Sequence, residues 1–417
     1  MRIGIVGLGY VGLPLAVAFA EAGHDVVGHD TDAERIDRLA RGESDIEDVT
    51  SDRLAGLSDR LVATSDAEEL AACDAILICV PTPLAAEREP DLTYVRASAA
   101  TIAGILREGQ LVVLESTTYP GTTREELLPP LERGGLKVGE GFHLAYSPER
   151  IDPGRSDNQI ASTPKVVGGM TPACLERAAA VYGEVCDEVV RVSSPEAAEL
   201  SKLLENIFRS VNIALVNELA QLTDRLGIDI WEVIDAASSK PFGFMRFEPG
   251  PGMGGHCLPV DPFYLAYKAR QHDFYTEFVE LAGKINQSHP LFCVSKIQRA
   301  LNDAGKAVNG ARVLLVGVSY KAGVADLREA PSLKIIRHLR ELGAEISYHD
   351  DLVPSLEGEG EDLRSVELGP AVAEADAVAI ITAHPGIDYP KLIYSAALVV
   401  DFRGVSRSFD APNVVRL

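Results

Sequence analysis

The chain has 417 residues, of which 46% are hydrophobic and 24% are charged, and its formal net charge at pH 7 is −23. The length predicts two or three domains, each with a core of its own. The excess of acidic residues argues against a nucleic acid or an anionic membrane as the partner, because both attract a basic surface. An anionic small molecule requires arginines and lysines gathered locally around its site.

The six cysteines show no CxxC pair and no spacing typical of metal ligands, so no metal is expected. This pattern suits free thiols in a reducing compartment. The stretch 1–23 could pass for a signal peptide, but its glycine pattern has a better explanation, given below. No other run is long and apolar enough to span a bilayer, so we expect a cytoplasmic protein.

The first third of the chain alternates strands and helices. We expect a strand at 2–7, a helix at 13–23 closed by its final glycine, and further strands at 25–30, 75–80 and 111–117. Such alternation predicts a parallel sheet with helices on both faces.

The middle of the chain is helical. Apolar residues recur at helical spacing from 195 onward, Ser194 with Pro195 marks a helix start, and Gly227 marks a break. We therefore expect one long helix and then a shorter one, ending at the loop 250–262. The prolines of this loop predict that it is neither a helix nor a central strand. A helix this long commonly packs against a second subunit, so we expect a homodimer.

The last third repeats the organisation of the first. Strands are expected at 311–317, 344–351, 375–384 and 397–404, with a helix at 332–343. The fold class is therefore α/β, with two Rossmann-like doubly wound domains joined by a central helical segment that contains a long helix. We place the domains at 1–193, 194–295 and 296–417.

A dinucleotide motif opens the chain. Gly7, Gly9 and Gly12 form a GxGxxG between a strand and a helix, which is the context that this motif requires. Asp30 ends the second strand, where a carboxylate accepts hydrogen bonds from ribose hydroxyls and repels a 2′-phosphate. NAD is therefore the expected cofactor rather than NADP, although the nearby Arg35 weakens this argument. The loop 317–323 lacks the motif and should bind a different ligand, or only half of a nucleotide.

The sequence "GPGMGGHCLPVDP" presents Cys257 among glycines that let backbone approach a ligand. A thiolate requires nearby positive charge or N–H donors. Lys202 shares one face of the long helix with Asn206 and could supply that charge. His256 is either the activating base or a packed neighbour.

These motifs together resemble the nucleotide-sugar 6-dehydrogenases, the UDP-glucose/GDP-mannose dehydrogenase family. The resemblance covers nearly the whole chain and rests on "GLGYVGLPLA", "ESTTYPGTT", "SPERIDPG", "KLLENIFRSVNIALVNE", "GPGMGGHCLPVDP" and "SYKAGVADLREAP". It implies oxidation of a sugar CH2OH to a carboxylate with two NAD and without release of the aldehyde. It also makes the first domain the NAD-binding domain, the second the helical dimerisation domain with the cysteine loop, and the third the nucleotide-sugar-binding domain.

The resemblance implies roles for individual residues. Cys257 is the expected nucleophile, which forms a thiohemiacetal and then a thioester, while Lys202 and Asn206 stabilise oxyanion charge. Asp261 positions water and tunes Lys202. Thr118 and Glu149 hold a catalytic water, and Glu149 acts in thioester hydrolysis.

Other residues are expected to bind the two ligands. The resemblance implies that Arg246 binds the sugar of the neighbouring subunit's substrate. It also implies that Lys321 and Arg403 contact the nucleotide sugar, and that Arg328 reaches back to NAD. The residues expected to contact NAD are Gly7, Gly9, Tyr10, Val11, Gly12, Asp30, Arg35, Val80, Pro81, Thr82, Ser116, Thr117, Thr118 and Arg328. Those expected to contact the substrate are Glu149, Arg150, Lys202, Asn206, Arg246, Phe247, Gly250, Gly254, Lys321 and Arg403.

The sequences "SPERIDPG" and "GGHCLPVDPFYL" are more similar to the branch of the family that oxidises UDP-N-acetylglucosamine, and this resemblance implies UDP-N-acetylglucosamine as the substrate. UDP-glucose, dTDP-glucose and UDP-N-acetylmannosamine are the alternatives. More remote alternatives are a β-hydroxyacid dehydrogenase, which needs neither the cysteine loop nor a second Rossmann-like domain, and a regulator that binds NAD without catalysis.

Overall fold

The computed structural model describes residues 1–46, 48–85, 89–150, 160–255 and 258–417. These residues form two compact units. The first comprises Met1–Glu205 with Phe263–Tyr275, and the second comprises Asn206–Pro262 with Thr276–Leu417. The three-domain division at 193 and 295 stays a prediction.

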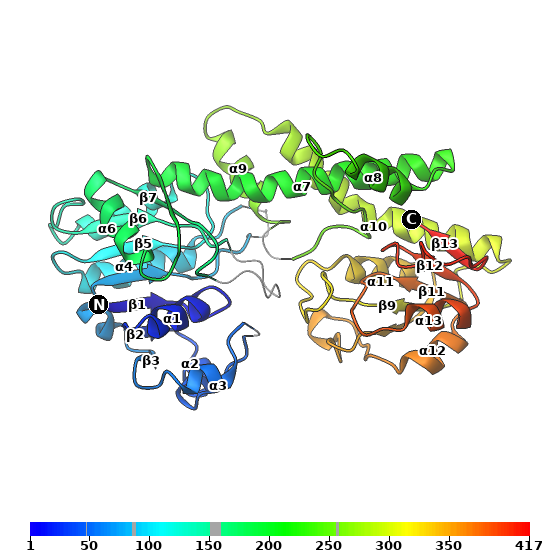
Figure 1. Cartoon of the computed structure of the whole chain (residues 1–417), viewed down its shortest axis with the longest axis horizontal. Coiled ribbons are helices and arrows are strands. Elements are labelled where there is room, and N and C mark those ends of the chain that lie inside the picture. Colours follow the sequence, from blue (N-terminus) through cyan, green and yellow to red (C-terminus); the bar gives the residue numbers. More distant parts are fainter. Residues whose placement is uncertain (47, 86–88, 151–159, 256–257) are drawn as a thin grey trace. The chain divides into compact units, whose positions relative to one another are not determined.

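The first unit is built on one sheet with the strand order β3-β2-β1-β4-β5-β6-β7-β8 (Figure 1). Its strands are β1 (Arg2–Val6), β2 (Asp25–His29), β3 (Leu61–Thr64), β4 (Ala75–Ile78), β5 (Leu111–Leu114), β6 (His143–Tyr146), β7 (Lys165–Gly169) and β8 (Val189–Val192). Its helices include α1 (Gly12–Glu21), α2 (Ala33–Ala40), α3 (Ser51–Ala55), α4 (Thr93–Ile105), α5 (Leu128–Glu132) and α6 (Pro172–Tyr182), with a short 3-10 helix η1 (Ala67–Ala72) and a short π-helix η2 (Thr123–Leu127). The two central strands, β4 and β5, are apolar and buried along their whole length, as is typical of a parallel sheet covered on both faces.

Neighbouring strands of this sheet are parallel except β6 and β7, which pair antiparallel. Parallel neighbours need a crossover, usually a helix, whereas antiparallel neighbours do not. The described part of the β6–β7 connection contains no helix, which is consistent with the reversal. The strands expected in the first third are confirmed, as is the helix that ends before Gly23.

The second unit contains a parallel sheet with the order β10-β9-β11-β12-β13. Its strands are β9 (Arg312–Val316), β10 (Glu345–His349), β11 (Ala377–Ile380), β12 (Val399–Asp401) and β13 (Val414–Arg416). The helices include α8 (Ile230–Ser238), α10 (Glu277–Asp303), α11 (Pro331–Glu341), α12 (Leu368–Glu374) and α13 (Tyr389–Ser395), with a turn at η3 (Glu357–Glu359). The predicted α/β fold with two doubly wound sheets is therefore confirmed.

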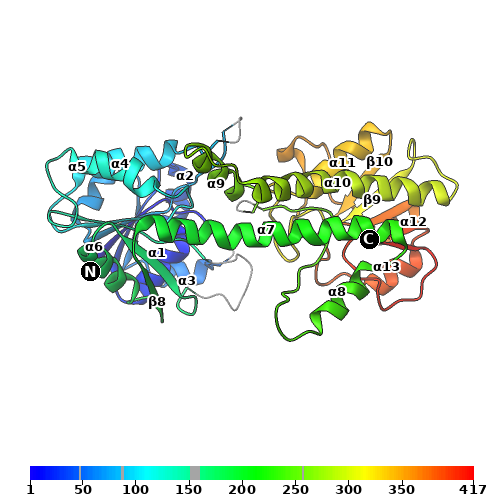
Figure 2. The same ribbon diagram turned by 90° about the horizontal axis from the view of Figure 1, so that it is seen from above.

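Helix α7 (Pro195–Leu226) is the predicted long helix, drawn as one unbroken helix in Figure 2. It begins at Pro195, where Ser194 Oγ accepts the Ala197 N–H at 3.2 Å, and it stops before Gly227, whose φ is +69°. These two signals are the ones that the sequence offers.

The prediction that no part of 250–262 is helical is wrong at its end. Helix α9 (Asp261–Arg270) begins at Asp261 and takes Pro262 as its second residue. Proline is tolerated in the first turn because the N–H that it lacks would have no helical partner there.

Helix α10 was not expected, and it contains Pro290. It lies beside α11 (Figure 2), and its residues Cys293, Ile297 and Leu301 belong to the buried core that includes β9. This burial outweighs the local cost of an internal proline, which is about 3 kcal/mol. No helix in the described part of the chain combines the length and apolarity needed to cross a bilayer.

Candidate functional site

The loop after β1 is shaped by glycines. Gly7 has a φ of +92°, which other residues avoid, and a Cβ on Gly12 would collide with the carbonyl oxygen of Gly7. A Cβ on Gly9 would meet no described atom within 4 Å, so the space beside this residue is open. Tyr10 is 53% exposed and Val11 is half-buried. This cradle at the first turn of a helix fits the pyrophosphate of a dinucleotide.

Asp30 follows β2 and shapes the same loop. Its carboxylate accepts the N–H of Leu8 at 2.8 Å and that of Asp32 at 3.0 Å, and Arg35 Nη1 lies 3.3 Å from Oδ2. Although burial alone raises it, the backbone donors and Arg35 hold the pKa of Asp30 below its usual value. The ionised carboxylate retains lone pairs for hydroxyl donors, so the residues present fit the adenosine ribose of NAD.

The loops after β4 and β5 lie together at the carboxyl edge of the sheet. Ser116 Oγ donates to the Val80 carbonyl at 2.7 Å, and Thr82 Oγ1 donates to the Thr117 carbonyl at 2.8 Å. Pro81, between these residues, is exposed. Ligands of doubly wound sheets bind at this edge, so the structure brings these predicted residues together where the fold favours a ligand.

Thr118 is fully buried, and its hydroxyl has no hydrogen-bond partner among the described residues. Leaving such a group unpaired costs about 1–3 kcal/mol, so it marks a place where a water or a ligand completes the structure. The predicted role of Thr118 in holding a catalytic water agrees with this geometry and stays a prediction.

Glu149 and Arg150 follow β6 and are both half-buried. Arg150 donates to the Pro164 carbonyl at 2.6 Å and pairs with Glu205 at 2.8 Å. The described contacts of Arg150 therefore hold its loop in place, and its predicted role in substrate binding stays a prediction.

Lys202 and Glu199 are buried on α7, at 8% and 0% exposure. Glu199 accepts the N–H of Gly121 at 2.6 Å and that of Thr123 at 2.9 Å. Burial raises the pKa of Glu199 to about 7, against the lowering effect of these hydrogen bonds. Glu199 thus ties α7 to the loop after Thr118. Glu199 is absent from the predicted site residues. The sequence feature that could have indicated it is its position three residues before Lys202, on the same helix.

Asn206, also on α7, donates from Nδ2 to Oδ2 of Asp261 at 2.5 Å. Both residues are buried, with 5% and 2% of their surface exposed. The predicted burial of Lys202 and Asn206 is confirmed. The bond to Asp261 fixes the orientation of the Asn206 amide, because the amide nitrogen must face the carboxylate.

The glycine loop packs closely on the last third of the chain. A Cβ on Gly250 would lie 2.7 Å from Nη1 of Arg403, and a Cβ on Gly254 would lie 2.7 Å from Cβ of Tyr320. Arg403 is oriented by a hydrogen bond from Nε to the Ile381 carbonyl at 2.7 Å. The structure therefore brings Gly250 against Arg403, whereas Gly254 packs on Tyr320 and on the Glu329 carbonyl, which is 3.0 Å from the position of such a Cβ.

Arg328 and Lys321 lie on the loop between β9 and α11. The Arg328 carbonyl accepts the Gly255 N–H at 2.9 Å, and its guanidinium pairs with Asp326 at 2.6 Å. Lys321 is half-buried. The predicted contacts of Arg328 with NAD and of Lys321 with the substrate stay predictions.

Arg246 is held by two carboxylates, those of Asp235 at 2.7 Å and Glu248 at 3.0 Å. Phe247 meets Phe208 edge-on with 5.7 Å between ring centroids. Donation of Arg246 to a neighbouring subunit stays a prediction. His256 and Cys257 lie outside the described residues, so their roles also stay predictions.

A buried ion pair near Glu149 is absent from the predicted residues. Lys165 lies 2.6 Å from Glu115, which also accepts the Tyr182 hydroxyl. Although burial alone lowers it, the charges of Glu115 and Glu149 raise the pKa of Lys165. A single lysine at the start of an apolar strand, "PKVVGG", was the only sequence signal for this pair.

Comparison with known proteins gives three matches in order along the chain. The NAD binding domain of the UDP-glucose/GDP-mannose dehydrogenase family matches residues 1–186, its central domain matches 196–288, and its UDP binding domain matches 314–408. The chain belongs to the UDP-glucose/GDP-mannose dehydrogenase family. It is an NAD-dependent nucleotide-sugar dehydrogenase, as the motifs predicted.

Similar proteins act on different sugars. A UDP-N-acetyl-D-glucosamine 6-dehydrogenase of Pseudomonas aeruginosa is 38% identical over 355 residues, covering 85% of this chain and 83% of the relative. An NDP-N-acetyl-D-galactosaminuronic acid dehydrogenase of Ralstonia solanacearum is 34% identical over 421 residues, covering 97% of this chain and 96% of the relative. The structure of a UDP-D-ManNAc dehydrogenase from Pyrococcus horikoshii matches with a TM-score of 0.90 and 32% identity, covering 100% and 98%.

Proposed function

We propose that this dehydrogenase oxidises C6 of UDP-N-acetylglucosamine from CH2OH to a carboxylate. The observation that carries the proposal is the ordered match of all three family domains, and the sugar is supported by the 38% identical relative. One sugar, one water and two NAD give one uronate and two NADH, with release of three protons. Bound NAD supplies the hydride acceptor for both oxidations.

The chain's own residues supply the rest of the chemistry. The Cys257 thiolate adds to the aldehyde carbon, and the resulting tetrahedral adduct can lose the second hydride to become a thioester. The Lys202 ammonium and the Asn206 amide donate to the oxygen that carries negative charge. Glu149, with water held at the Thr118 hydroxyl, promotes hydrolysis of the thioester and regenerates the thiolate.

The substrate is held by basic groups at the nucleotide and by glycines at the sugar. Arg403 and Lys321 neutralise the diphosphate, which is how a chain of net charge −23 can bind an anion. The close packing of Gly250 against Arg403 supports this placement, because the glycine loop then borders the same region as the guanidinium.

A homodimer is supported by an exposed apolar face on the second-unit part of α7. Phe208, Leu215, Leu219, Leu222 and Leu226 recur at helical spacing and are each 39–60% exposed. Such a stripe is typical of a helix that packs on another helix. The predicted cytoplasmic location is supported by the free thiols at Cys73, Cys79, Cys174, Cys186 and Cys293.

The test is NADH formation with UDP-N-acetylglucosamine, UDP-glucose, UDP-N-acetylmannosamine, GDP-mannose and dTDP-glucose measured side by side. The proposal expects the highest kcat/KM with UDP-N-acetylglucosamine. A higher value with another sugar would replace the substrate and leave the enzyme class intact. The Cys257→Ser variant should bind NAD normally and form no uronate, and uronate formation at the normal rate would disprove the covalent step.

A further inference from the structure

The two sheets of the chain repeat one another in register. β1 pairs with β4 from Ile3↔Ala75 to Val6↔Ile78, and β9 pairs with β11 from Val313↔Ala377 to Val316↔Ile380. The second strands also agree, because Val6 pairs with His29 and Val316 pairs with His349. Counting from these strands, the equivalent pairs are Gly7 and Gly317, Gly9 and Ser319, Asp30 and Asp350, and Thr82 and His384.

The carboxylates of the two halves hold their loops in the same way. Asp350 accepts the N–H of Val318 at 2.8 Å and that of Leu352 at 2.9 Å. Asp30 accepts the corresponding N–H groups of Leu8 and Asp32 at 2.8 and 3.0 Å. The second half therefore keeps the frame of a nucleotide-binding turn.

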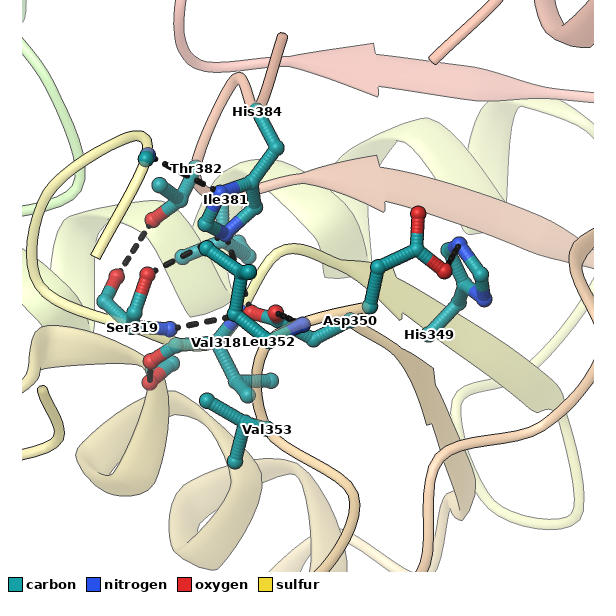
Figure 3. Close-up of polar contacts among 12 residues, drawn as sticks. Val318, Ser319, His349, Asp350, Leu352, Val353, Ile381, Thr382 and His384 are labelled. Atoms are coloured by element: carbon teal, nitrogen blue, oxygen red, sulfur yellow. Dashed lines mark hydrogen bonds and ion pairs between the residues drawn. The ribbon is translucent and has the colours of Figure 1, made fainter. Parts of the chain in front are cut away.

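The two halves differ in what covers the carboxylate. His384 Nε2 lies 3.0 Å from Oδ2 of Asp350 and 3.1 Å from Oγ of Ser319 (Figure 3). Asp350 is only 1% exposed, and Ser319 is also 1% exposed. In the first half a glycine, Gly9, stands at the position of Ser319 and leaves open space. In the second half, His384 and Ser319 thus lie against the carboxylate of Asp350, which corresponds to Asp30.

The hydrogen bonds define the tautomer of His384. The Gly323 N–H points at Nδ1 at 3.2 Å, so Nδ1 is an acceptor and the ring proton is on Nε2, facing Asp350. Ser319 Oγ donates to the Lys321 carbonyl at 2.9 Å. The serine and the aspartate share one ring nitrogen, whereas a nucleophilic triad needs them on opposite nitrogens, so this cluster does not activate Ser319.

We propose that His384 is a positioning residue for the substrate's nucleotide, acting through the loop 319–323. His384 occupies the hydrogen-bonding position on Asp350 that a ribose hydroxyl would need. It also contacts Ser319 and the Gly323 N–H, which lie on either side of Lys321, and so holds this loop in place. The inference rests on the proposed function only in taking Lys321 as a ligand of the nucleotide diphosphate. In the second half, a rigid loop that carries Lys321 would thus bind phosphate, whereas in the first half a carboxylate would bind ribose.

The test uses the full-length enzyme with His384→Thr, which restores the residue of the first half, and His384→Gln, which keeps an N–H donor for Asp350. His384→Thr should raise the KM for the nucleotide sugar and the Kd for UDP roughly tenfold, as expected when buried hydrogen-bond partners are left unpaired. The glutamine variant should raise both constants only about threefold, because its amide N–H keeps the bond to Asp350 while its amide oxygen does not reproduce the position of Nδ1 opposite the Gly323 N–H. The kcat and the KM for NAD should not change.

The Lys321→Ala background distinguishes positioning from general stability. In the Lys321→Ala background, neither His384 substitution should weaken UDP binding further, because the lysine through which His384 acts is absent. Equal losses in both backgrounds, unchanged UDP affinity in both variants, or a parallel loss of NAD binding would overturn the proposal. If His384→Thr does not fold, His384→Gln decides by the same criteria. A wild-type enzyme that binds UDP but makes no NADH from any nucleotide sugar would instead refute the proposed function.

Discussion

The amide of Asn206 on α7 donates to the carboxylate of Asp261 at the start of α9, with both side chains buried and 2.5 Å between the bonded atoms. One of the two amide protons of Asn206 is thereby fixed, and the other has a defined direction. A preoriented donor needs no reorganisation when oxyanion charge develops, which is why such donors are effective in catalysis.

Removal of this donor should slow turnover. Asn206→Ala is expected to lower kcat about 100-fold or more, which is typical for loss of one oxyanion donor, with the KM for NAD unchanged. Asp261→Ala should lower kcat by a similar factor, and the double variant should have a kcat little lower than that of either single variant. Steady-state kinetics test this. Asn212→Ala is the matched control, because that amide donates to the Phe208 carbonyl of its own helix. Additive losses would contradict the coupling.

The carboxylate of Asp30 should govern cofactor choice. Asp30→Ala should raise the KM for NAD at least about tenfold, since the expected ribose contacts and the hydrogen bond that orients the Leu8 N–H are both removed. Asp32→Ala, which removes an exposed helix cap on α2, should leave the KM for NAD unchanged. Initial rates with NAD and NADP measure the preference, and equal use of both by the wild type would contradict the ribose argument.

Burial of Glu199 should make stability depend on pH. The pKa of Glu199 is raised to about 7 in the folded chain, against 4.5 for an ordinary glutamate. The folded state therefore holds this proton more tightly. The contribution of this protonation to the free energy of unfolding is on the order of 3 kcal/mol. It is fully present below about pH 4.5 and is lost as pH rises through about 7.

Denaturant unfolding between pH 4.5 and 8 measures this effect. Glu199→Gln should remove it, so the difference in unfolding free energy between wild type and variant should change across that window. Glu218→Gln, an exposed change on the same helix, is the control. A pH-independent difference would show that Glu199 ionises normally in the folded chain.

The apolar face of α7 should hold two subunits together. Leu215→Glu combined with Leu222→Glu places charges on two side chains that are 53% and 50% exposed, so folding of the monomer should survive while association weakens. Sedimentation velocity should give a dimer for the wild type and a monomer for the variant. A monomeric wild type at micromolar concentration would contradict the expected dimer.

The sequence predicts the fold well where the signals are local. The glycines after β1, the acid after β2, and the Ser194 and Gly227 boundaries of α7 each act within a few residues of the feature that they predict. Helix α10 was missed because Pro290 argues against a helix, and only packing of its apolar face against the sheet outweighs that cost.

The site is predictable only in part for the same reason. Gly7, Thr118 and Asn206 sit in motifs, whereas the partners that orient them are set by the fold. The Lys165–Glu115 pair joins residues 50 positions apart, and His384 meets Asp350 across 34 positions. No local pattern marks such pairs, because each residue alone resembles an ordinary surface or strand position.

The most direct test of the account is the number of NADH molecules formed per nucleotide sugar consumed, measured at exhaustion of the preferred sugar. Capture of the aldehyde by the enzyme and its further oxidation predict a ratio of two, with uronate as the product and no free aldehyde. A ratio of one, with an aldehyde or ketone as the product, would contradict the four-electron chemistry and the role given to Cys257.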